Sequence, residues 1–314
     1  MRKVSIIGAG SVGSTIAYTL VTGGIASEIV MIDVNEQKSL GEAMDIRQGT
    51  PFCPACTIYA GTYADAKDSD IVIITSGIAR KPGQSRLDLV QTNVNILKSI
   101  TPQITAVAPD AIYIIVSNPV DILTYVFNKI SGIPENRIIG SGTILDTARL
   151  RSRLAEYYSI SQHNVHAYVF GEHGDSSFVP WSIATITNVP IDKYQDSLTN
   201  KDALQPALNF EEVEKYMRTS GGRIIARKGA TFYAVAVSVC HICKCVFSSM
   251  DTALSISTMM HGEYGIDDVA LSTLSIVGKN GINGKILSQL TDHEVELLRH
   301  SADCLKEVIA QIEY

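Results

Sequence analysis

The sequence of 314 residues lacks several features that would assign it at once to a class of proteins. It contains no cluster of Lys and Arg residues, and its formal net charge is −6. Proteins that bind nucleic acids or membrane surfaces usually concentrate basic residues on one face, so neither role is expected. No apolar run approaches the roughly 18 residues that a membrane-spanning helix needs. We therefore expect a cytoplasmic protein.

The six cysteines lack the spacing of a closed zinc site. Such a site usually takes four converging ligands, often from two CxxC pairs. Cys53 and Cys56 form one such pair, but Cys240, Cys243 and Cys245 lie in an apolar, helix-like stretch. We interpret the cysteines of this helix-like stretch as reduced thiols packed in a core, and we expect no metal. A disulfide framework is not expected in a chain of this length without a secretory signal.

The first residues have some features of a signal peptide, because two basic residues precede the apolar run 4–7. Five glycines between positions 8 and 24 interrupt that pattern. The first strand of a fold therefore explains the run better. The chain contains no internal repeat and no low-complexity linker.

Short apolar runs alternate with helix-like segments through the first half of the chain. The expected strands are 4–7, 28–32, 71–74 and 111–116, and the expected helices are 14–21, 36–48 and 87–107. Strands joined by helical crossovers predict an α/β fold with a doubly wound parallel sheet of the Rossmann type. The alternation ends near residue 142, which predicts a first domain over 1–141 and a mixed α+β second domain over 142–314.

A glycine motif follows the first expected strand and opens the first expected helix. Gly8 permits a tight turn, Gly10 lets the backbone approach a pyrophosphate, and Gly13 allows close packing of helix against strand. Asp33 follows the second strand, where it would bind ribose hydroxyls and repel a 2′-phosphate. The pattern predicts a site for NAD rather than NADP. The alternative is that these are only turn glycines and an acid at a strand end.

Two arginines, Arg80 and Arg86, lie on one stretch that also contains Pro82 and Gly83. Proline and glycine indicate a loop, which we place at about 78–89. Two guanidinium groups on one loop suggest a lid that closes over an anionic substrate. A solvated basic loop is the alternative.

The second half supplies a candidate acid–base pair. His173 lies between glycines, where its ring can face a cleft, and Asp146 and Arg149 are three residues apart on one expected helical face. Hydride transfer between NAD and a carbonyl needs a group that exchanges a proton with the oxygen, and histidine suits neutral pH. A carboxylate behind the histidine would stabilise its imidazolium form. Spacing alone does not show that His173 and Asp146 touch.

The chain resembles the L-lactate/malate dehydrogenase family along nearly its whole length. Five motifs occur in the family's order: Gly8-x-Gly10-x-x-Gly13, Lys81-Pro-Gly-x-x-Arg86, Ser117-Asn118-Pro-Val-Asp, Gly140-Ser-Gly-Thr-Ile-Leu-Asp146-Thr-Ala-Arg149 and Gly171-Glu-His173-Gly-Asp175.

The resemblance implies a role for each matching residue. His173 would be the proton donor and acceptor with Asp146 as its partner, and Arg149 would bind the substrate carboxylate as a bidentate pair. Arg86 would polarise the reacting carbonyl. The remaining implied substrate residues are Arg80, Asn118 and Thr231. The implied cofactor residues are Gly8, Gly10, Val12, Gly13, Asp33, Thr75, Gly77, Asn118 and Ser141.

The resemblance also implies regulation and assembly. Arg151 and His166 match positions that bind fructose 1,6-bisphosphate in allosteric bacterial lactate dehydrogenases, although simple structural pairing is an equal alternative for them. The same branch of the family suggests a homotetramer.

One position departs from the surrounding pattern. Gly140-Ser-Gly-Thr143 and the segment ending at Thr231 follow the lactate branch, whereas Arg80 stands where that branch usually has glutamine and the malate branch has arginine. In a closed pocket Arg80 would need a second carboxylate, which oxaloacetate has and pyruvate lacks. We therefore expect malate/oxaloacetate as the preferred pair, with lactate/pyruvate as the alternative.

Two other classes of protein remain. An NAD-dependent glycosidase would need a metal held by Cys and His, for which the cluster at 240–245 is the only candidate. A non-catalytic NAD-binding protein would be expected to lose His173, Asp146 or Arg149, and the chain has all three.

Overall fold

The computed structural model describes residues 2–78, 86–199 and 207–314, and of Arg86 only the backbone. Arg80 lies outside the described residues, as does most of the loop predicted over 78–89. The lid that we predicted for this loop therefore stays a prediction.

Among the described residues, nine strands form one sheet in the order β12-β11-β10-β6-β5-β4-β1-β2-β3. Six of these strands are parallel to one another: β1 (Lys3–Ile7), β2 (Glu28–Ile32), β3 (Thr57–Ala60), β4 (Ile71–Ile74), β5 (Ile112–Ile115) and β6 (Ile138–Gly140). Their order, 3-2-1-4-5-6, is that of a dinucleotide-binding fold. The predicted doubly wound parallel sheet is confirmed.

The other three strands come from the second half of the chain and extend the same sheet. They are β10 (Thr252–His261), β11 (Asp267–Gly278) and β12 (Gly281–Lys285), all antiparallel. Strand β10 meets β6 where Ser257 pairs with Gly140. The sequence pattern did not predict this continuity. The division into domains at 141/142 stays a proposal.

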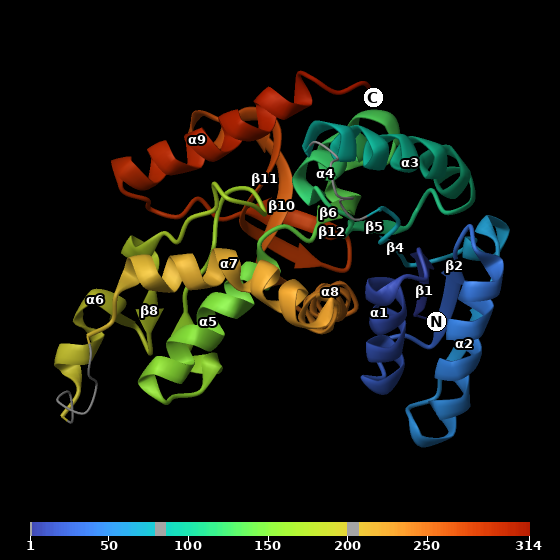
Figure 1. Cartoon of the computed structure of the whole chain (residues 1–314), viewed down its shortest axis with the longest axis horizontal. Helices are drawn as coiled ribbons and strands as arrows, with labels where there is room; N and C mark the ends of the chain where they lie inside the picture. Colours follow the sequence, from blue (N-terminus) through green and yellow to red (C-terminus); the bar gives the residue numbers. More distant parts are fainter. Residues whose placement is uncertain (1, 79–85, 200–206) are drawn as a thin grey trace.

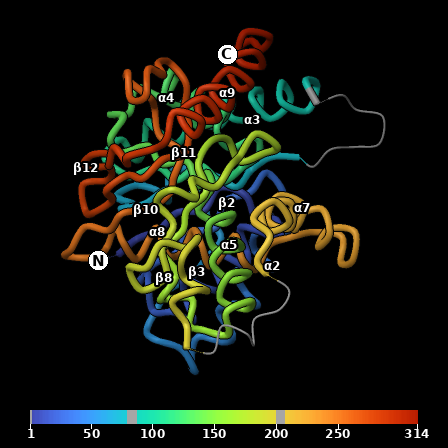
Figure 2. Tube along the Cα trace, turned by 90° about the vertical axis from the view of Figure 1, so that its left-hand side faces the viewer, coloured from blue at the N-terminus to red at the C-terminus, as the bar shows by residue number. Residues whose placement is uncertain are grey.

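Helices cover the large sheet on both faces (Figure 1). One face carries α1 (Ser11–Thr22), α2 (Glu36–Gly49) and α8 (Tyr233–Val246), and the other carries α3 (Arg86–Val107), α4 (Val120–Ile130) and α9 (Asp292–Ile309). Figure 2 shows the same separation after a 90° turn, with α3, α4 and α9 in its upper half and α2 and α8 in its lower half. Each face of the sheet thus has its own apolar core. The burial of apolar side chains in that core holds the helices against the sheet.

A third core lies in the second half of the chain. It joins α5 (Ile144–Tyr158) and α7 (Phe210–Lys228) to the short helix α6 (Ile191–Tyr194) and to a small sheet of β7 (Val165–His166), β8 (Thr185–Ile186) and β9 (Val189–Pro190). Short 3-10 turns lie at Thr50–Phe52, Tyr63–Ala66, Glu135–Arg137, Gln162–Asn164, Trp181–Ile183, Gln195–Ser197 and Glu263–Gly265.

The cysteines at 240, 243 and 245 are all free and buried on α8. Burial raises the pKa of Cys240 to about 12, so this thiol stays protonated. The predicted packing of these three thiols in a core is confirmed. No described helix is both long and apolar enough to span a bilayer.

The parallel strands bring the predicted cofactor residues to one edge of the sheet. The glycine turn follows β1, Asp33 follows β2, Thr75 and Gly77 follow β4, Asn118 follows β5 and Ser141 follows β6. Carboxyl ends of parallel strands meet at a common edge, and the crevice there is where ligands of this fold bind. The fold therefore places residues that are more than a hundred positions apart beside one another.

Candidate active site

The glycine turn after β1 has the shape of a phosphate cradle. Gly8 has a φ of +111°, which favours glycine. A Cβ on Gly13 would lie 1.9 Å from the carbonyl oxygen of Gly8, so no other residue fits there. A Cβ on Gly10 would meet no described atom within 4 Å, and Gly10 is the N-cap residue of α1, which has no side-chain cap. The first N–H groups of α1 are thus open to a phosphate.

Asp33 ties the end of β2 to this turn. One carboxylate oxygen accepts the N–H of Ala9 at 2.6 Å, and the other accepts the N–H of Asn35 at 2.8 Å. Each oxygen keeps a lone pair, and the side chain is partly exposed. The carboxylate can therefore still accept a hydrogen bond from a ribose hydroxyl.

Thr75 stabilises the glycine turn, because its hydroxyl donates to the carbonyl oxygen of Gly8 at 3.0 Å. Beside it, Gly77 is close to Asn93, a buried residue of α3 that we did not predict. Asn93 accepts from the N–H of Ile78 at 2.9 Å and donates to the carbonyl of Asn118 at 2.8 Å. It joins the segments that follow β4 and β5. The available signal was a polar residue within the apolar stripe of α3.

The open turn, the uncapped helix and the partly free carboxylate fit a dinucleotide. Gly8, Gly10, Gly13 and Asp33 surround the edge of the sheet where the adenosine half of NAD would lie, and Asn118 and Ser141 lie at the strand ends further along. When bound, NAD supplies or accepts a hydride there.

The structure brings His173 and Asp146 together. Nδ1 of His173 lies 2.5 Å from one carboxylate oxygen of Asp146, and Nη1 of Arg149 donates to the other oxygen at 2.9 Å. Asp146 and Arg149 are one turn apart on α5 and so share a face. Asp146 is only 4% exposed, so the three groups form one compact cluster of charges.

The charges in this cluster set each other's protonation. Burial alone would raise the pKa of Asp146, but His173 and Arg149 together hold that pKa below its ordinary value. Burial alone would lower the pKa of His173. The nearby carboxylate of Asp146 has the opposite and stronger effect, so the pKa of His173 is raised. Both shifts favour an imidazolium beside a carboxylate. A histidine in that state can donate a proton near neutral pH.

A cavity of about 280 Å³ opens beside this cluster. Its lining includes seven of the predicted residues: Val12, Asn118, Ser141, Asp146, Arg149, His173 and Thr231. Arg80 and the side chain of Arg86 lie outside the part of the chain that the structure describes, so neither is placed relative to this cavity.

Helix α7 contributes residues to this cavity that the sequence did not single out. Arg218 lines it while donating to the carbonyl of Ser177 at 2.9 Å and to Glu214 at 2.8 Å. A Cβ on Gly221 would lie 3.4 Å from Nη2 of Arg149, so glycine leaves room for the guanidinium group. No local motif indicates either residue, because Gly221 acts through the packing of α7 against Arg149 of α5 and Arg218 through a contact with Ser177, 41 positions away.

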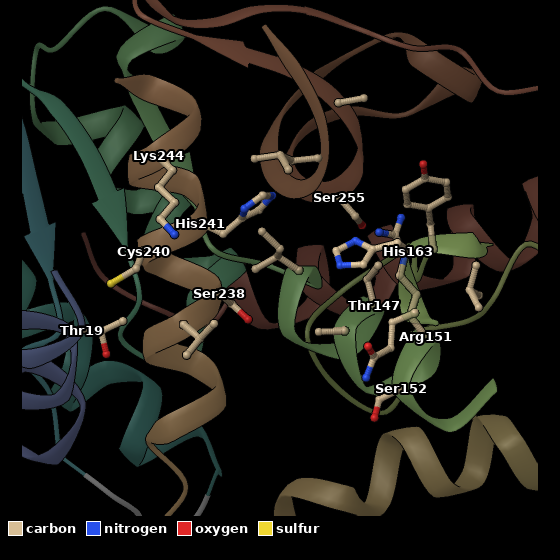
Figure 3. Close-up of a pocket in the computed structure, with 18 of the residues that line it drawn as sticks. Thr19, Thr147, Arg151, Ser152, His163, Ser238, Cys240, His241, Lys244 and Ser255 are labelled. Atoms are coloured by element: carbon tan, nitrogen blue, oxygen red, sulfur yellow. The ribbon is translucent and has the colours of Figure 1, made fainter. Parts of the chain in front are cut away.

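Arg151 and His166 lie at a different and larger cavity, of about 760 Å³, between α1, α5 and α8. The basic residues that line it are Arg151, His163, His166, His241 and Lys244, and its lining, taken over the described residues, contains no Asp or Glu. Figure 3 shows His241 and Lys244 on α8 opposite Arg151 on α5. Nε of Arg151 donates to the carbonyl of Ala167 at 3.0 Å.

The fold and the site together define a class of enzyme. A dinucleotide cradle lies at the same sheet edge as a histidine–carboxylate pair and an arginine that can bind an acid. That combination is the machinery of a nicotinamide-dependent dehydrogenase.

Comparison with known proteins gives the family. The model of the lactate/malate dehydrogenase NAD binding domain matches residues 2–140, and that of the lactate/malate dehydrogenase alpha/beta C-terminal domain matches residues 143–314. The chain belongs to the lactate/malate dehydrogenase family. It is an NAD-dependent oxidoreductase that acts on the CH–OH group of a 2-hydroxy acid.

Relatives and solved structures agree with this assignment. L-lactate dehydrogenases from Acetivibrio thermocellus and Thermoanaerobacter sp. are 44% and 46% identical over 313 residues, covering 100% of this chain and 98% and 100% of those proteins. A lactate dehydrogenase from a Medee basin deep-sea metagenome library is 37% identical with a TM-score of 0.93, over 99% of both chains. The minor L-lactate dehydrogenase of Enterococcus mundtii has the same identity and TM-score, over 99% of this chain and 98% of its own.

Proposed function

We propose that the chain is an L-lactate dehydrogenase, which interconverts pyruvate and L-lactate with NAD. The observation that supports a 2-keto acid substrate is the cluster of His173, Asp146 and Arg149 on one cavity. The choice of lactate is supported by the names of relatives that are 44–46% identical over nearly their whole length. This replaces malate, which we favoured on Arg80 alone.

In this proposal His173 moves the proton. Its imidazolium donates to the carbonyl oxygen of the keto acid during reduction and recovers the proton during oxidation. Asp146 holds the ring by Nδ1, which directs Nε2 to the substrate and stabilises the charged form. Because Asp146 is buried on α5 and contacts the half-buried ring of His173, the orientation of the ring does not have to be acquired during each turnover.

The same proposal assigns substrate binding to the residues around the cavity. Arg149 uses one Nη to bind Asp146, and its other edge faces Gly221, where a substrate carboxylate can approach the guanidinium fork. Asn118 and Thr231 line the cavity beside it. In the predicted closure of the loop at about 78–89, Arg86 would stabilise negative charge on the reacting oxygen.

The proposed cofactor contacts come from the first 141 residues and the proposed substrate contacts mainly from 142–314. The glycine turn with Val12 would bind the pyrophosphate, and Asp33 the adenosine ribose. Ser141 would hold the nicotinamide carboxamide. A cytoplasmic location belongs to the same proposal, and the free cysteines fit a reducing compartment.

Malate dehydrogenase activity is the second candidate, because Arg80 offers a cation for a second substrate carboxylate. The test compares kcat/KM for pyruvate and oxaloacetate with NADH, in the wild type and in Arg80→Gln. Lactate dehydrogenase activity predicts that the wild type prefers pyruvate. A wild-type preference for oxaloacetate that Arg80→Gln reverses would establish the second candidate instead.

We also propose that the larger cavity binds fructose 1,6-bisphosphate as an effector and that the chain forms a homotetramer. The support for an anion is the lining of that cavity, in which Arg151, His166 and Lys244 lie with no acid among the described residues. Activity measured with and without the bisphosphate tests the first proposal, and light scattering of the purified protein tests the second.

A further inference from the structure

Asp121 is a buried acid to which the proposed reaction assigns no role. It lies in the first turn of α4 and is 3% exposed. One carboxylate oxygen accepts the backbone N–H of His173 at 2.7 Å. The other makes no hydrogen bond of normal geometry with the described residues, although the nearby Ser257 hydroxyl lowers the pKa of the carboxyl group. Burial raises the pKa of Asp121 to about 6. A half-satisfied buried carboxylate destabilises a fold, so its presence beside His173 calls for a reason.

The contact with His173 differs from those that hold the rest of its segment. The preceding N–H, of Glu172, donates to the hydroxyl of Ser301 at 2.8 Å, which is a neutral acceptor. At His173 the acceptor is a carboxylate. His173 is therefore held by two acids from two helices, with Asp146 on its ring and Asp121 on its main chain.

Asp121 also connects His173 to the residue that follows β5. Asn118 lines the substrate cavity three positions before Asp121, and α4 begins between them at Val120. The side-chain amide of Asn93 donates to the carbonyl oxygen of Asn118 at 2.8 Å. One helical turn thus sets the spacing between His173 and Asn118, which must contact the same small substrate.

We propose that Asp121 is a positioning residue that fixes the main chain of His173 relative to Asn118 and adds negative charge behind the imidazolium. The inference rests on the proposed role of His173 as proton donor. Its electrostatic part agrees with the attraction between the Asp121 carboxylate and His173, which raises the pKa of the histidine alongside the larger effect of Asp146.

Several other charges face His173. Asp146 and Arg149 on α5 act on its pKa directly, Asp175 and Arg218 line the same cavity, and Glu172 precedes it in the chain and acts on Asp121. An Asp121 variant keeps all of these charged residues. Any shift in the pKa of His173 in that variant therefore reports the loss of the Asp121 charge. Removing that charge disfavours the imidazolium, which lowers the pKa of His173.

The test is Asp121→Asn, which keeps the shape and an acceptor for the His173 N–H but removes the charge. Reduction of pyruvate requires protonated His173, so kcat/KM falls as pH rises through its pKa. In the variant we expect that alkaline limb to move to lower pH by on the order of one unit. Asp121→Ala removes the acceptor as well, and we expect kcat to fall about tenfold or more while the Kd for NADH stays within about twofold.

Ser301→Ala is the matched control, because it removes a neutral acceptor from the neighbouring N–H. We expect it to change the Tm but not the position of the alkaline limb. If Asp121→Ala does not fold, the isosteric Asp121→Asn still carries the test. An Asp121→Asn profile that superimposes on that of the wild type, with kcat/KM within about twofold, overturns the inference. A wild type that reduces no 2-keto acid overturns the proposed function itself.

Discussion

The two cavities beside α5 use charged residues in opposite ways. In the smaller cavity the cations lie against acids: Arg149 and His173 both contact Asp146, and Arg218 contacts Glu214. In the larger cavity the lining, within the described residues, has five basic side chains and no acid. Paired charges keep a fixed geometry and protonation, which suits chemistry on a small substrate. Basic side chains without an acid among them suit the binding of an anion from outside.

The largest expected effect comes from breaking the pairing in the smaller cavity. Asp146→Asn leaves the volume unchanged but removes the charge that stabilises the imidazolium of His173. We expect kcat/KM for pyruvate to fall by about 10³-fold, as for carboxylates behind other catalytic histidines. NADH absorbance gives the rate, and an unchanged Kd for NADH is the control. A loss below tenfold would contradict the role of this pair.

The second effect concerns the arginine fork. Arg149→Lys keeps the positive charge but loses the bidentate geometry. We expect KM for pyruvate to rise by about 10²-fold with a smaller change in kcat. Steady-state kinetics at saturating NADH measure the split, and Arg153→Lys, at an exposed pair with Glu156 on the same helix, is the matched control. If both variants behave alike, the fork at Arg149 does not bind substrate.

A smaller effect is expected from the larger cavity. Arg151→Gln removes one of its cations, and we expect the activation constant for fructose 1,6-bisphosphate to rise about tenfold while activity without effector stays within about twofold. Titration of the rate with the bisphosphate measures both quantities. If Arg151→Gln abolished basal activity, the two cavities would not be separable in function.

The smallest effect concerns pH at the larger cavity. Burial, Lys244 and Arg151 lower the pKa of His241, so this ring is mostly neutral near pH 7. A bound anion would favour its charged form, and linkage then requires the effector to bind more tightly as pH falls through that pKa. In His241→Gln we expect the slope of the activation constant against pH to be about half of its wild-type value. An unchanged slope would show that His241 does not face the anion.

Much of the first half of the chain could be predicted, because its signals are local. The strands at 28–32 and 71–74 have the predicted bounds, and the helix predicted at 14–21 begins three residues earlier, at Ser11. Short apolar runs bounded by turn residues identify buried strands without knowledge of their neighbours. The joining of β10 to β6 was not predictable in this way, since it depends on a contact between Ser257 and Gly140.

The sequence by itself determined the residue types of the site and the order of the motifs, because each motif spans only a few positions. The tertiary structure decided which of them meet. His173 reaches Asp146 across 27 positions and Asp121 across 52, and Asn93 reaches Asn118 across 25. Such contacts depend on how helices pack on a sheet, and packing is a property of the whole core rather than of any segment.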